Sequence, residues 1–282
     1  MSDSAQTEAL PTILYAVADG IATVTFNRPE ARNAFTFEMY ERLVEICETV
    51  NADSAIRAMI LTGAGGRAFA AGTDIAQFRA FSTPEDALGY EARIDRVLGA
   101  LETCRAPTIA AIAGACTGGG AAIAGCCDLR IAASNARFGF PIARTLGNCL
   151  SMSNYARFAE LLGIARLKEL ILTARLFEAQ EALAIGLVSE VVAEPAGLMA
   201  RAQELARLVA GHAPLTLQAT KQALRRLRPA IPRDDGDRLI LMCYMSDDFK
   251  EGMNAFLEKR APVFSGLQPW ARDSAGRLAA FR

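Results

Sequence analysis

One long segment without a charged side chain, residues 107–127, limits what this chain can fold into. A stretch of this length is long enough to cross a bilayer. However, it consists mainly of alanine and glycine, has few large aliphatic side chains, and is interrupted by Gly118-Gly119-Gly120. We therefore expect a buried strand, a turn and a buried helix here, and no membrane association.

The patterns on either side of this segment predict an α/β fold. Alternating apolar residues at 13–17 and 21–26 flank Ala18-Asp19-Gly20, which favours a β-hairpin. Helical spacing then alternates with short apolar runs. This pattern predicts helices at 36–50 (with Thr36 as its cap), 84–104 and 118–127, and strands at 58–61, 108–113 and 129–132. Such an order implies a largely parallel sheet that is covered on both faces.

Beyond residue 151 the pattern becomes mainly helical. Helices are expected at 161–172, 179–185, 195–210, 214–227 and 238–256, with one short strand at 187–192. Helices with apolar faces often pack on neighbouring subunits. We divide the chain into a core at 1–194, which would hold the site, and a helical oligomerisation region with a peripheral tail at 195–282.

Composition and charge exclude several classes of partner. The net charge is −1, so no overall field favours nucleic acid, and a nucleic-acid-binding role is disfavoured. Seven cysteines without a C-x-x-C pair indicate a reducing compartment, and a single histidine makes a zinc site unexpected. The polar start of the chain lacks a signal pattern, so we expect a cytoplasmic protein.

Two glycine-rich turns, residues 67–75 and 114–120, could carry chemistry. Each follows a predicted strand, and small residues let a ligand approach the backbone closely. The first N–H groups of a helix have no internal partner, and two that converge on one point would stabilise an oxyanion. The alternative for each turn is a tight connection without function. Neither turn matches a dinucleotide or nucleotide motif.

Six segments in order carry a resemblance to a known family. They are Phe26-Asn27-Arg28-Pro29 through Asn33-Ala34-Phe35, Ala68-Phe69-Ala70-Ala71-Gly72-Thr73-Asp74-Ile75, 109–120, 127–132, 182–188, and Glu251-Gly252 through Glu258-Lys259-Arg260. Together they resemble the crotonase superfamily, the enoyl-CoA hydratase/isomerase proteins. The resemblance implies a spiral of ββα units with a C-terminal helical trimerisation region, a homotrimer or homohexamer, and a role in fatty acid metabolism.

The resemblance also implies roles for particular residues. The backbone N–H groups of Thr73 and Gly119 would form an oxyanion hole for the carbonyl of a coenzyme A thioester. Coenzyme A would enter as part of the substrate, with no tightly bound cofactor and no metal. The residues implied on the substrate side are Arg32 at a phosphate, the Ala70 carbonyl at the adenine, Asp74, Ile75, and Phe256 with Lys259 from a neighbouring subunit. For Asp74 the alternative is a cap at the start of a helix.

The chain departs from the hydratase pattern at both catalytic acids. The two glutamates that position water in hydratases fall on Ala122 and Ile142 here, and neither side chain performs acid–base chemistry. The next loop places Arg144, Asn148 and Cys149 near the expected acyl pocket. Helix capping or packing is the alternative for this loop, which also contains Ser151. A nucleophilic pair of Cys149 with His212 is not expected.

We therefore predict an acyl-CoA enzyme of this family that stabilises a thioester enolate and hydrates simple enoyl-CoA weakly or not at all. A decarboxylase, isomerase or hydrolase that uses another acid is one rival. The acids of the predicted helix at 84–104, Glu85, Asp86, Glu91 and Asp95, could supply such a group. A non-catalytic acyl-CoA-binding protein is the rival from another class.

Overall fold

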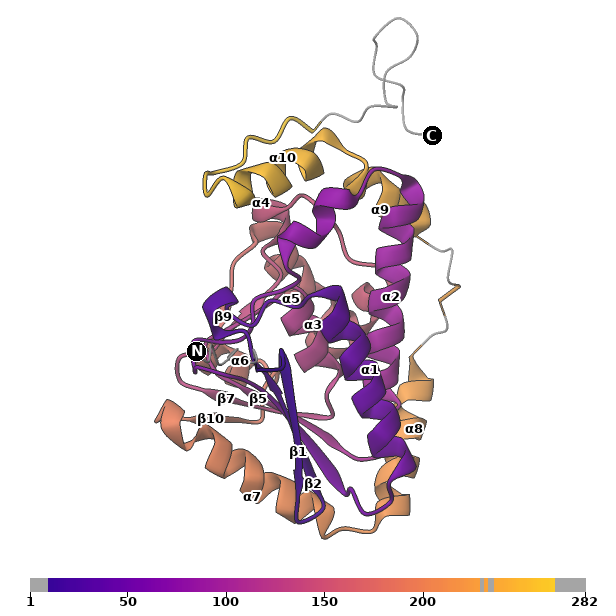
Figure 1. The fold of residues 1–282 in the computed structure, drawn as a ribbon, viewed down its shortest axis with the longest axis vertical. Coiled ribbons are helices and arrows are strands. Elements are labelled where there is room, and N and C mark those ends of the chain that lie inside the picture. The colour runs from indigo at the N-terminus through magenta and orange to yellow at the C-terminus, as the bar shows by residue number, and fades with distance from the viewer. Residues whose placement is uncertain (1–9, 229–230, 233–235, 267–282) are drawn as a thin grey trace, which may run out of the picture.

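The computed structural model describes residues 10–228, 231–232 and 236–266, and it contains two β-sheets surrounded by helices (Figure 1). The larger sheet has the order β1-β2-β3-β5-β7-β10 and the smaller one β4-β6-β8-β9. The strands of the larger sheet are β1 (Ile13–Ala18), β2 (Ile21–Phe26), β3 (Ala58–Gly63), β5 (Thr108–Ile112), β7 (Leu129–Ala133) and β10 (Glu190–Val192). Those of the smaller sheet are β4 (Ala68–Ala70), β6 (Ala115–Thr117), β8 (Arg137–Gly139) and β9 (Phe177–Glu178).

The prediction of a largely parallel sheet is confirmed. β1 and β2 form the predicted antiparallel hairpin, and every later pairing in the larger sheet is parallel. Alternate residues of each central strand face opposite hydrophobic clusters, as Met59 and Ile60 of β3 do. Both faces are therefore buried, which explains why these strands lack a polar alternation.

One face of the larger sheet is covered by α1 (Phe37–Ala52), α2 (Pro84–Glu102) and α3 (Gly119–Cys126). The Thr36 hydroxyl accepts a hydrogen bond from the Met39 amide, so the predicted cap of α1 is confirmed. Thr83 and Asp86 form a capping box at the start of α2. The short elements η1 (Pro29–Ala31) and η2 (Ile75–Ala80) lead into α1 and α2.

The opposite face is covered by α7 (Leu198–Ala210), which follows η3 (Pro195–Gly197). Leu198, Ala202 and Ala206 of α7 are buried against β3, β5 and β7. The first helix of the C-terminal region therefore packs on the core sheet (Figure 1).

Several predicted helices have different bounds. The helix predicted at 161–172 begins earlier, as α5 (Met152–Thr173), because Ser151 caps it; a non-helical residue, Gly163, bends it. The helix predicted at 238–256 is divided into α9 (Asp237–Tyr244) and α10 (Asp247–Leu257), because the Ser246 side chain caps a new helix start. The remaining helices are α4 (Ile142–Thr145), α6 (Ala179–Ala184) and α8 (Pro214–Leu227). The predicted tail beyond Gly266 lies outside the described residues.

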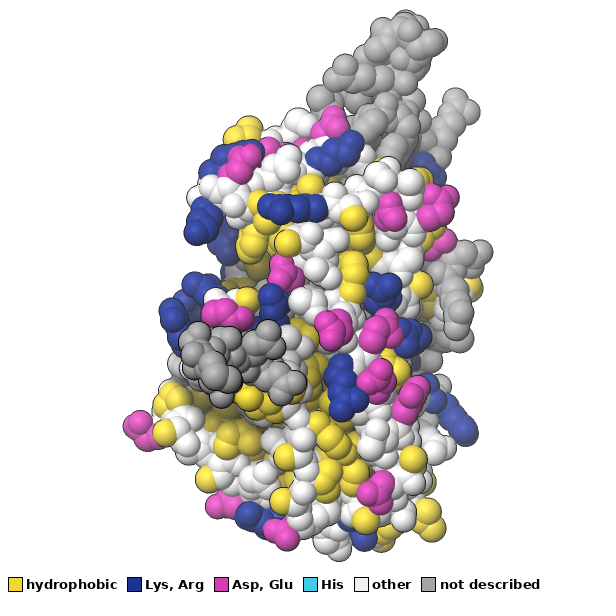
Figure 2. All heavy atoms as spheres, in the orientation of Figure 1, with side chains coloured by type: hydrophobic (Ala, Val, Ile, Leu, Met, Phe, Trp, Pro, Cys, Tyr) yellow, Lys and Arg dark blue, Asp and Glu magenta, His cyan; other side chains and the backbone are white. Residues whose placement is uncertain are grey.

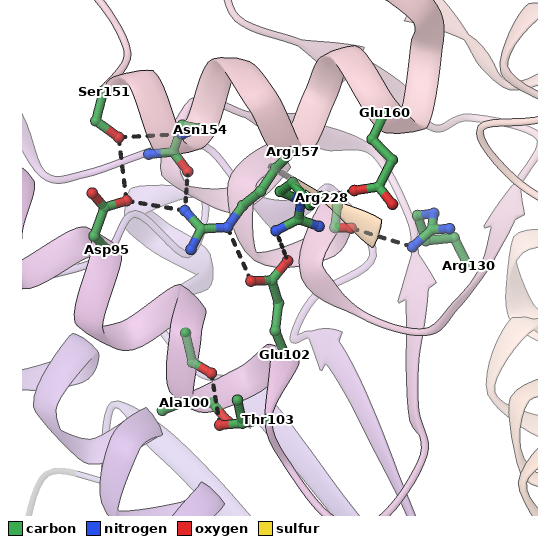
Figure 3. A network of polar contacts seen from close by, with 12 residues as sticks. Asp95, Ala100, Glu102, Thr103, Arg130, Ser151, Asn154, Arg157, Glu160 and Arg228 are labelled. Carbon is green, nitrogen blue, oxygen red and sulfur yellow. Dashed lines mark hydrogen bonds and ion pairs between the residues drawn. The ribbon is translucent and has the colours of Figure 1, made fainter. Parts of the chain in front are cut away.

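A partly buried ion-pair network connects α5 to its neighbours (Figure 3). The Arg157 guanidinium of α5 pairs with Asp95 at 3.0 Å and Glu102 at 3.1 Å, both on α2. Arg228, just after α8, pairs with Glu102 at 2.8 Å and Glu160 at 2.7 Å. This network connects α2 to α5 and to the end of α8.

The uncharged segment 107–127 forms the predicted strand, β5, and the predicted helix, α3, but the turn expected between them contains a further short strand, β6. Within the described residues, no helix is both long and apolar enough to span a membrane. Basic and acidic side chains are intermixed over the face shown in Figure 2. This face therefore presents no extended surface of one sign.

Candidate active site

The two predicted glycine-rich turns meet in the structure. Gly72 and Gly118 both have positive φ, at 95° and 52°, a region that favours glycine. A Cβ atom on Gly118 would lie 3.4 Å from the Gly72 Cα, and one on Gly72 would lie 3.9 Å from the Gly119 amide nitrogen. Because Gly72 and Gly118 have no side chains, the backbone just before Thr73 can lie against the start of α3.

The Thr73 amide points away from its neighbouring strand segment. Phe35 forms a parallel bridge with Thr73, in which the Phe35 N–H donates to the Gly72 carbonyl and the Asp74 N–H donates to the Phe35 carbonyl, both at 2.8 Å. In such a bridge the N–H of the middle residue faces the opposite side. Thr73 therefore presents its N–H on the side away from Phe35.

The Gly119 amide is at the first position of α3, where N–H groups have no partner within the helix. The first backbone bond of this helix runs from the Ala122 N–H to the Gly118 carbonyl, at 2.9 Å. Over the part of the chain that the structure describes, neither the Thr73 nor the Gly119 N–H has a protein acceptor. Two neighbouring turns thus offer unpaired donors, which is what anion binding requires.

The segment before α1 holds the first turn in place. The buried Asn33 side chain donates to the Ala64 and Ala68 carbonyls, at 3.0 and 2.7 Å. Arg28 pairs with the Asp74 carboxylate at 3.0 Å, and the same carboxylate caps η2 at the Ala76 amide. In this chain Asp74 therefore occupies the helix-cap position that the sequence offered as its alternative role.

A cluster of three hydroxyl groups lies beside Gly119, and no pattern in the sequence indicates it. The Thr73 hydroxyl is 2.8 Å from the Tyr40 hydroxyl and 2.7 Å from the Tyr90 hydroxyl. A Cβ atom on Gly119 would lie 2.2 Å from the Tyr40 hydroxyl and 3.3 Å from the Thr73 hydroxyl. Burial raises the pKa of both tyrosines, so all three groups are neutral hydroxyls at ordinary pH.

The two positions expected to carry hydratase glutamates are buried and apolar. Ala122 lies one turn into α3, and Ile142 begins α4 just after β8. β8 pairs with β6, and the Gly118 N–H donates to the Gly139 carbonyl at 3.0 Å. Ile142 therefore follows the strand that borders the start of α3, in the same hydrophobic cluster as Ala122.

Glu91 is a buried carboxyl group on α2, next in sequence to Tyr90. Burial raises its pKa to about 8, although a hydrogen bond from the Tyr244 hydroxyl, at 2.5 Å, opposes this effect. Tyr244 in turn accepts a hydrogen bond from the Asn148 side chain at 3.1 Å. The predicted pocket residue Asn148 is thus linked through α9 to Glu91. In the sequence, Glu91 comes three residues before Ile94 and seven before Leu98, so it falls on the apolar face of the helix. This position is the sequence signal for a buried acid.

The other acids of α2 are used differently. Asp86 completes the capping box, Glu85 is exposed, and Asp95 pairs with Arg157 and accepts from the Ser151 hydroxyl at 3.2 Å (Figure 3). Glu91 is therefore the buried acid of this helix, and it is hydrogen-bonded to the Tyr244 hydroxyl.

The other predicted pocket residues, Arg144 and Cys149, are not fully buried. Arg144 is exposed on α4. Cys149 is half-buried, and its thiol donates to the Leu239 carbonyl of α9 at 3.4 Å. His212 is exposed after α7, where its carbonyl accepts from Arg57. α7 and α9 lie at opposite ends of the molecule in Figure 1, so His212 is remote from Cys149.

The residues implied for coenzyme A are spread over two regions. Ala70 is the last residue of β4, and its carbonyl faces Gly120. Arg32 is exposed, and its backbone carbonyl accepts a hydrogen bond from the Ala71 amide at 3.0 Å. Ile75 is half-buried at the start of η2. Phe256 and Lys259 are exposed at the end of α10. Their expected contacts with the nucleotide remain predictions.

Comparisons with known proteins agree with this architecture. The sequence model of the family described as Enoyl-CoA hydratase/isomerase matches residues 16–268. The chain is 39% identical to the short-chain-enoyl-CoA hydratase of Clostridium acetobutylicum, over 85% of this chain and 92% of that protein. It is similar to an enoyl-CoA hydratase/carnithine racemase structure from Magnetospirillum magneticum, with a TM-score of 0.73, 35% identity, and coverage of 92% and 97%. A methylmalonyl-CoA decarboxylase in complex with 2-nitronate-propionyl-CoA gives a TM-score of 0.83, 30% identity, and coverage of 92% and 100%. The chain therefore belongs to the enoyl-CoA hydratase/isomerase family, the crotonase superfamily, whose fold it has.

Proposed function

We propose that this acyl-CoA enzyme stabilises a thioester enolate with the backbone N–H groups of Thr73 and Gly119. The observation that carries the proposal is the meeting of two glycine turns at which both N–H groups lack a protein acceptor. Donors that are held in place before the reaction stabilise an oxyanion without reorganisation. The carbonyl of a coenzyme A thioester, the substrate implied by the family, is the acceptor we expect.

We further propose that hydration of a simple enoyl-CoA is weak or absent. Ala122 and Ile142 stand where the hydratase pattern has carboxyl groups, and neither moves a proton. Several similar proteins are named hydratases, including the one from Clostridium acetobutylicum. We therefore expect this chain to act on the same class of substrate as those relatives, with the same fold, but to catalyse a different reaction.

Decarboxylation of an α-carboxyacyl-CoA, such as a malonyl-type thioester, is the specific reaction that the site supports best. Loss of CO₂ breaks the bond between the α-carbon and the carboxylate and leaves a thioester enolate, which then takes a proton from solvent. The reaction therefore needs oxyanion donors but no water activated for attack. An apolar surrounding such as that of Ala122 and Ile142 favours loss of a charged carboxylate, because the charge is poorly solvated there. The likeness to methylmalonyl-CoA decarboxylase, with TM-scores of 0.83 and 0.82 in two complexes, supports this choice.

Incubation of the protein with crotonyl-CoA, methylmalonyl-CoA and malonyl-CoA, followed by mass spectrometry, tests the proposal. We expect loss of CO₂ from methylmalonyl-CoA or malonyl-CoA and little gain of water by crotonyl-CoA. Rapid hydration of crotonyl-CoA would refute the role given to positions 122 and 142. Binding of every ester without turnover would instead favour the non-catalytic alternative.

We also propose that the chain forms a homotrimer or homohexamer through its C-terminal helices. The amphipathic helix α8 contains no buried residue, and Leu215, Leu224 and Leu227 are 77, 56 and 76% exposed. Leu224 and Leu227 are three residues apart and so share one face of α8, and an exposed apolar face is typical of a covered interface. Light scattering during gel filtration would measure the mass, and a 30 kDa monomer would refute this arrangement. The seven free thiols support a cytoplasmic location.

A further inference from the structure

The thiols of Cys149 and Cys243 lie against each other, although the two residues are far apart in the sequence. Cys149 is in the segment 147–151, which has no regular secondary structure and leads into α5, and Cys243 is near the end of α9. A hydrogen bond joins the two thiols, and the Cys149 thiol also faces the Leu239 carbonyl at 3.4 Å. Leu239 precedes Cys243 by about one helical turn, so both sulfur atoms meet at the same turn of α9.

Access to solvent distinguishes this pair of thiols from a second pair in the core. Cys149 and Cys243 are both half-buried. Cys47 and Cys104 are also joined by a hydrogen bond, but each is only 1% exposed. A thiol reacts with a dissolved oxidant when it is accessible and can form a thiolate. The first pair therefore has the access that the second pair lacks.

The contact between the two half-buried thiols gives them different acidities. The hydrogen bond from Cys149 stabilises a thiolate on Cys243 and lowers the pKa of Cys243, and burial opposes this effect only in part. The same contact, together with burial, raises the pKa of Cys149. Cys243 is therefore the thiol suited to attack an oxidant, and Cys149 is the thiol next to it that can attack the oxidised sulfur.

We propose that Cys149 and Cys243 are an oxidative modification site, at which a hydroperoxide converts the two thiols into a reversible intramolecular disulfide. None of the groups proposed for enolate chemistry takes part, so this inference goes beyond the proposed function and does not depend on it. The disulfide joins the loop before α5 to α9. It lies beside the hydrogen bond from Asn148 to Tyr244, which connects the neighbouring residues of the same two segments at 3.1 Å.

The oxidation takes place in two steps. The Cys243 thiolate attacks one oxygen of the hydroperoxide, the O–O bond breaks, and the other oxygen takes a proton and leaves as an alcohol or as water. Cys243 is then a sulfenic acid. The Cys149 sulfur attacks the Cys243 sulfur, the S–O bond breaks, and the departing hydroxide takes the Cys149 proton to form water. Two thiols are oxidised to one disulfide, and the hydroperoxide is reduced.

Peptide mapping of the full-length protein tests the proposal. The reduced protein is treated with hydrogen peroxide, its remaining thiols are alkylated, and it is digested with trypsin. Cys149 and Cys243 then fall on the peptides 145–157 and 239–250, whereas Cys47 and Cys104 fall on 43–57 and 97–105. We expect a cross-link between the first two peptides, no cross-link between the last two, and loss of the cross-link after treatment with dithiothreitol.

Two variants test which thiol attacks the peroxide. Cys149→Ser removes the second thiol, so the sulfenic acid on Cys243 should persist and be labelled by dimedone, a reagent for sulfenic acids. Cys243→Ser should give weaker labelling of Cys149, because burial disfavours its thiolate. Thermal unfolding of the reduced variants shows that they are folded. Stronger labelling of Cys149 than of Cys243 would overturn the assignment of the attacking thiol.

Three results with the unmodified protein would overturn the proposal itself. One is oxidation of Cys149 or Cys243 to sulfinic acid without a cross-link between their peptides. Another is a cross-link between Cys47 and Cys104 that forms as fast, because access would then not select the pair. The third is a cross-link between two copies of the chain, which a non-reducing gel would show as a band of twice the mass.

Discussion

The buried carboxyl group of Glu91 makes the stability of this protein depend on pH in a direction that can be calculated. Burial raises the pKa of Glu91 from 4.5 to about 8, and the hydrogen bond from Tyr244 only partly offsets this. The folded protein therefore holds a proton that the unfolded chain releases above about pH 4.5. A group whose folded pKa is raised in this way destabilises the folded state progressively as the pH increases toward the folded pKa.

The size of the effect follows from the two pKa values. With 4.5 in the unfolded chain and about 8 in the folded protein, the free energy of unfolding is lowered by about 1 kcal/mol at pH 5 and by about 4 kcal/mol at pH 8. The difference between these two pH values is about 3 kcal/mol. Glu91→Gln removes the titration while keeping a carbonyl oxygen for the Tyr244 hydroxyl.

Urea denaturation at pH 5, 6, 7 and 8, at one fixed protein concentration, measures this prediction. The stability of Glu91→Gln relative to the unmodified protein should rise by about 3 kcal/mol from pH 5 to pH 8. Any constant cost of the substitution cancels in this comparison. Glu48→Gln, at an exposed position of α1, is the matched control and should show a flat difference. A flat difference for Glu91→Gln as well would show that the reasoning about its burial is wrong.

Three further predictions concern packing, ion pairs and thiols. Gly119→Ala would place a Cβ 2.2 Å from the Tyr40 hydroxyl, so thermal unfolding should show a loss of stability; Gly89→Ala meets no atom within 4 Å and should stabilise its helix by about 0.5 kcal/mol. Equal effects of the two would contradict the close packing at Gly119. Arg157→Ala should cost about 1–2 kcal/mol in urea denaturation, because Asp95 loses its ion-pair partner and Glu102 keeps only Arg228, whereas the exposed Arg42→Ala should change stability by less than about 0.5 kcal/mol. An alkylating reagent should modify only the two half-buried thiols of the folded protein within minutes, and rapid modification of the buried ones, seen by mass spectrometry, would refute their placement.

The sequence predicts the regular part of the fold because its local signals agree with the tertiary structure. Thr36 precedes an apolar helical pattern and caps α1, and the uncharged segment that contains Gly118 forms strand, turn and helix. The smaller sheet could not be predicted. Its strands have two or three residues each, too short for a periodic pattern, and they exist because turns from distant parts of the chain pair.

The sequence likewise indicates only some residues of the candidate site. Glycine patterns indicate where Thr73 and Gly119 expose their amides, and an acid on an apolar helix face indicates Glu91. The hydroxyls of Tyr40 and Tyr90 could not be found from the sequence, because a tyrosine on an apolar helix face is ordinarily a packing residue. Their convergence on Thr73 depends on how α1 and α2 pack beside the first turn, which no local pattern encodes.

The central claim is that amides from two separate turns bind a single thioester oxygen, and a crystal structure of the protein with 2-nitronate-propionyl-CoA tests it most directly. We predict that the thioester oxygen lies about 3 Å from the amide nitrogens of both Thr73 and Gly119. A bound ester whose oxygen contacts neither nitrogen, with the acyl group elsewhere, would contradict the account.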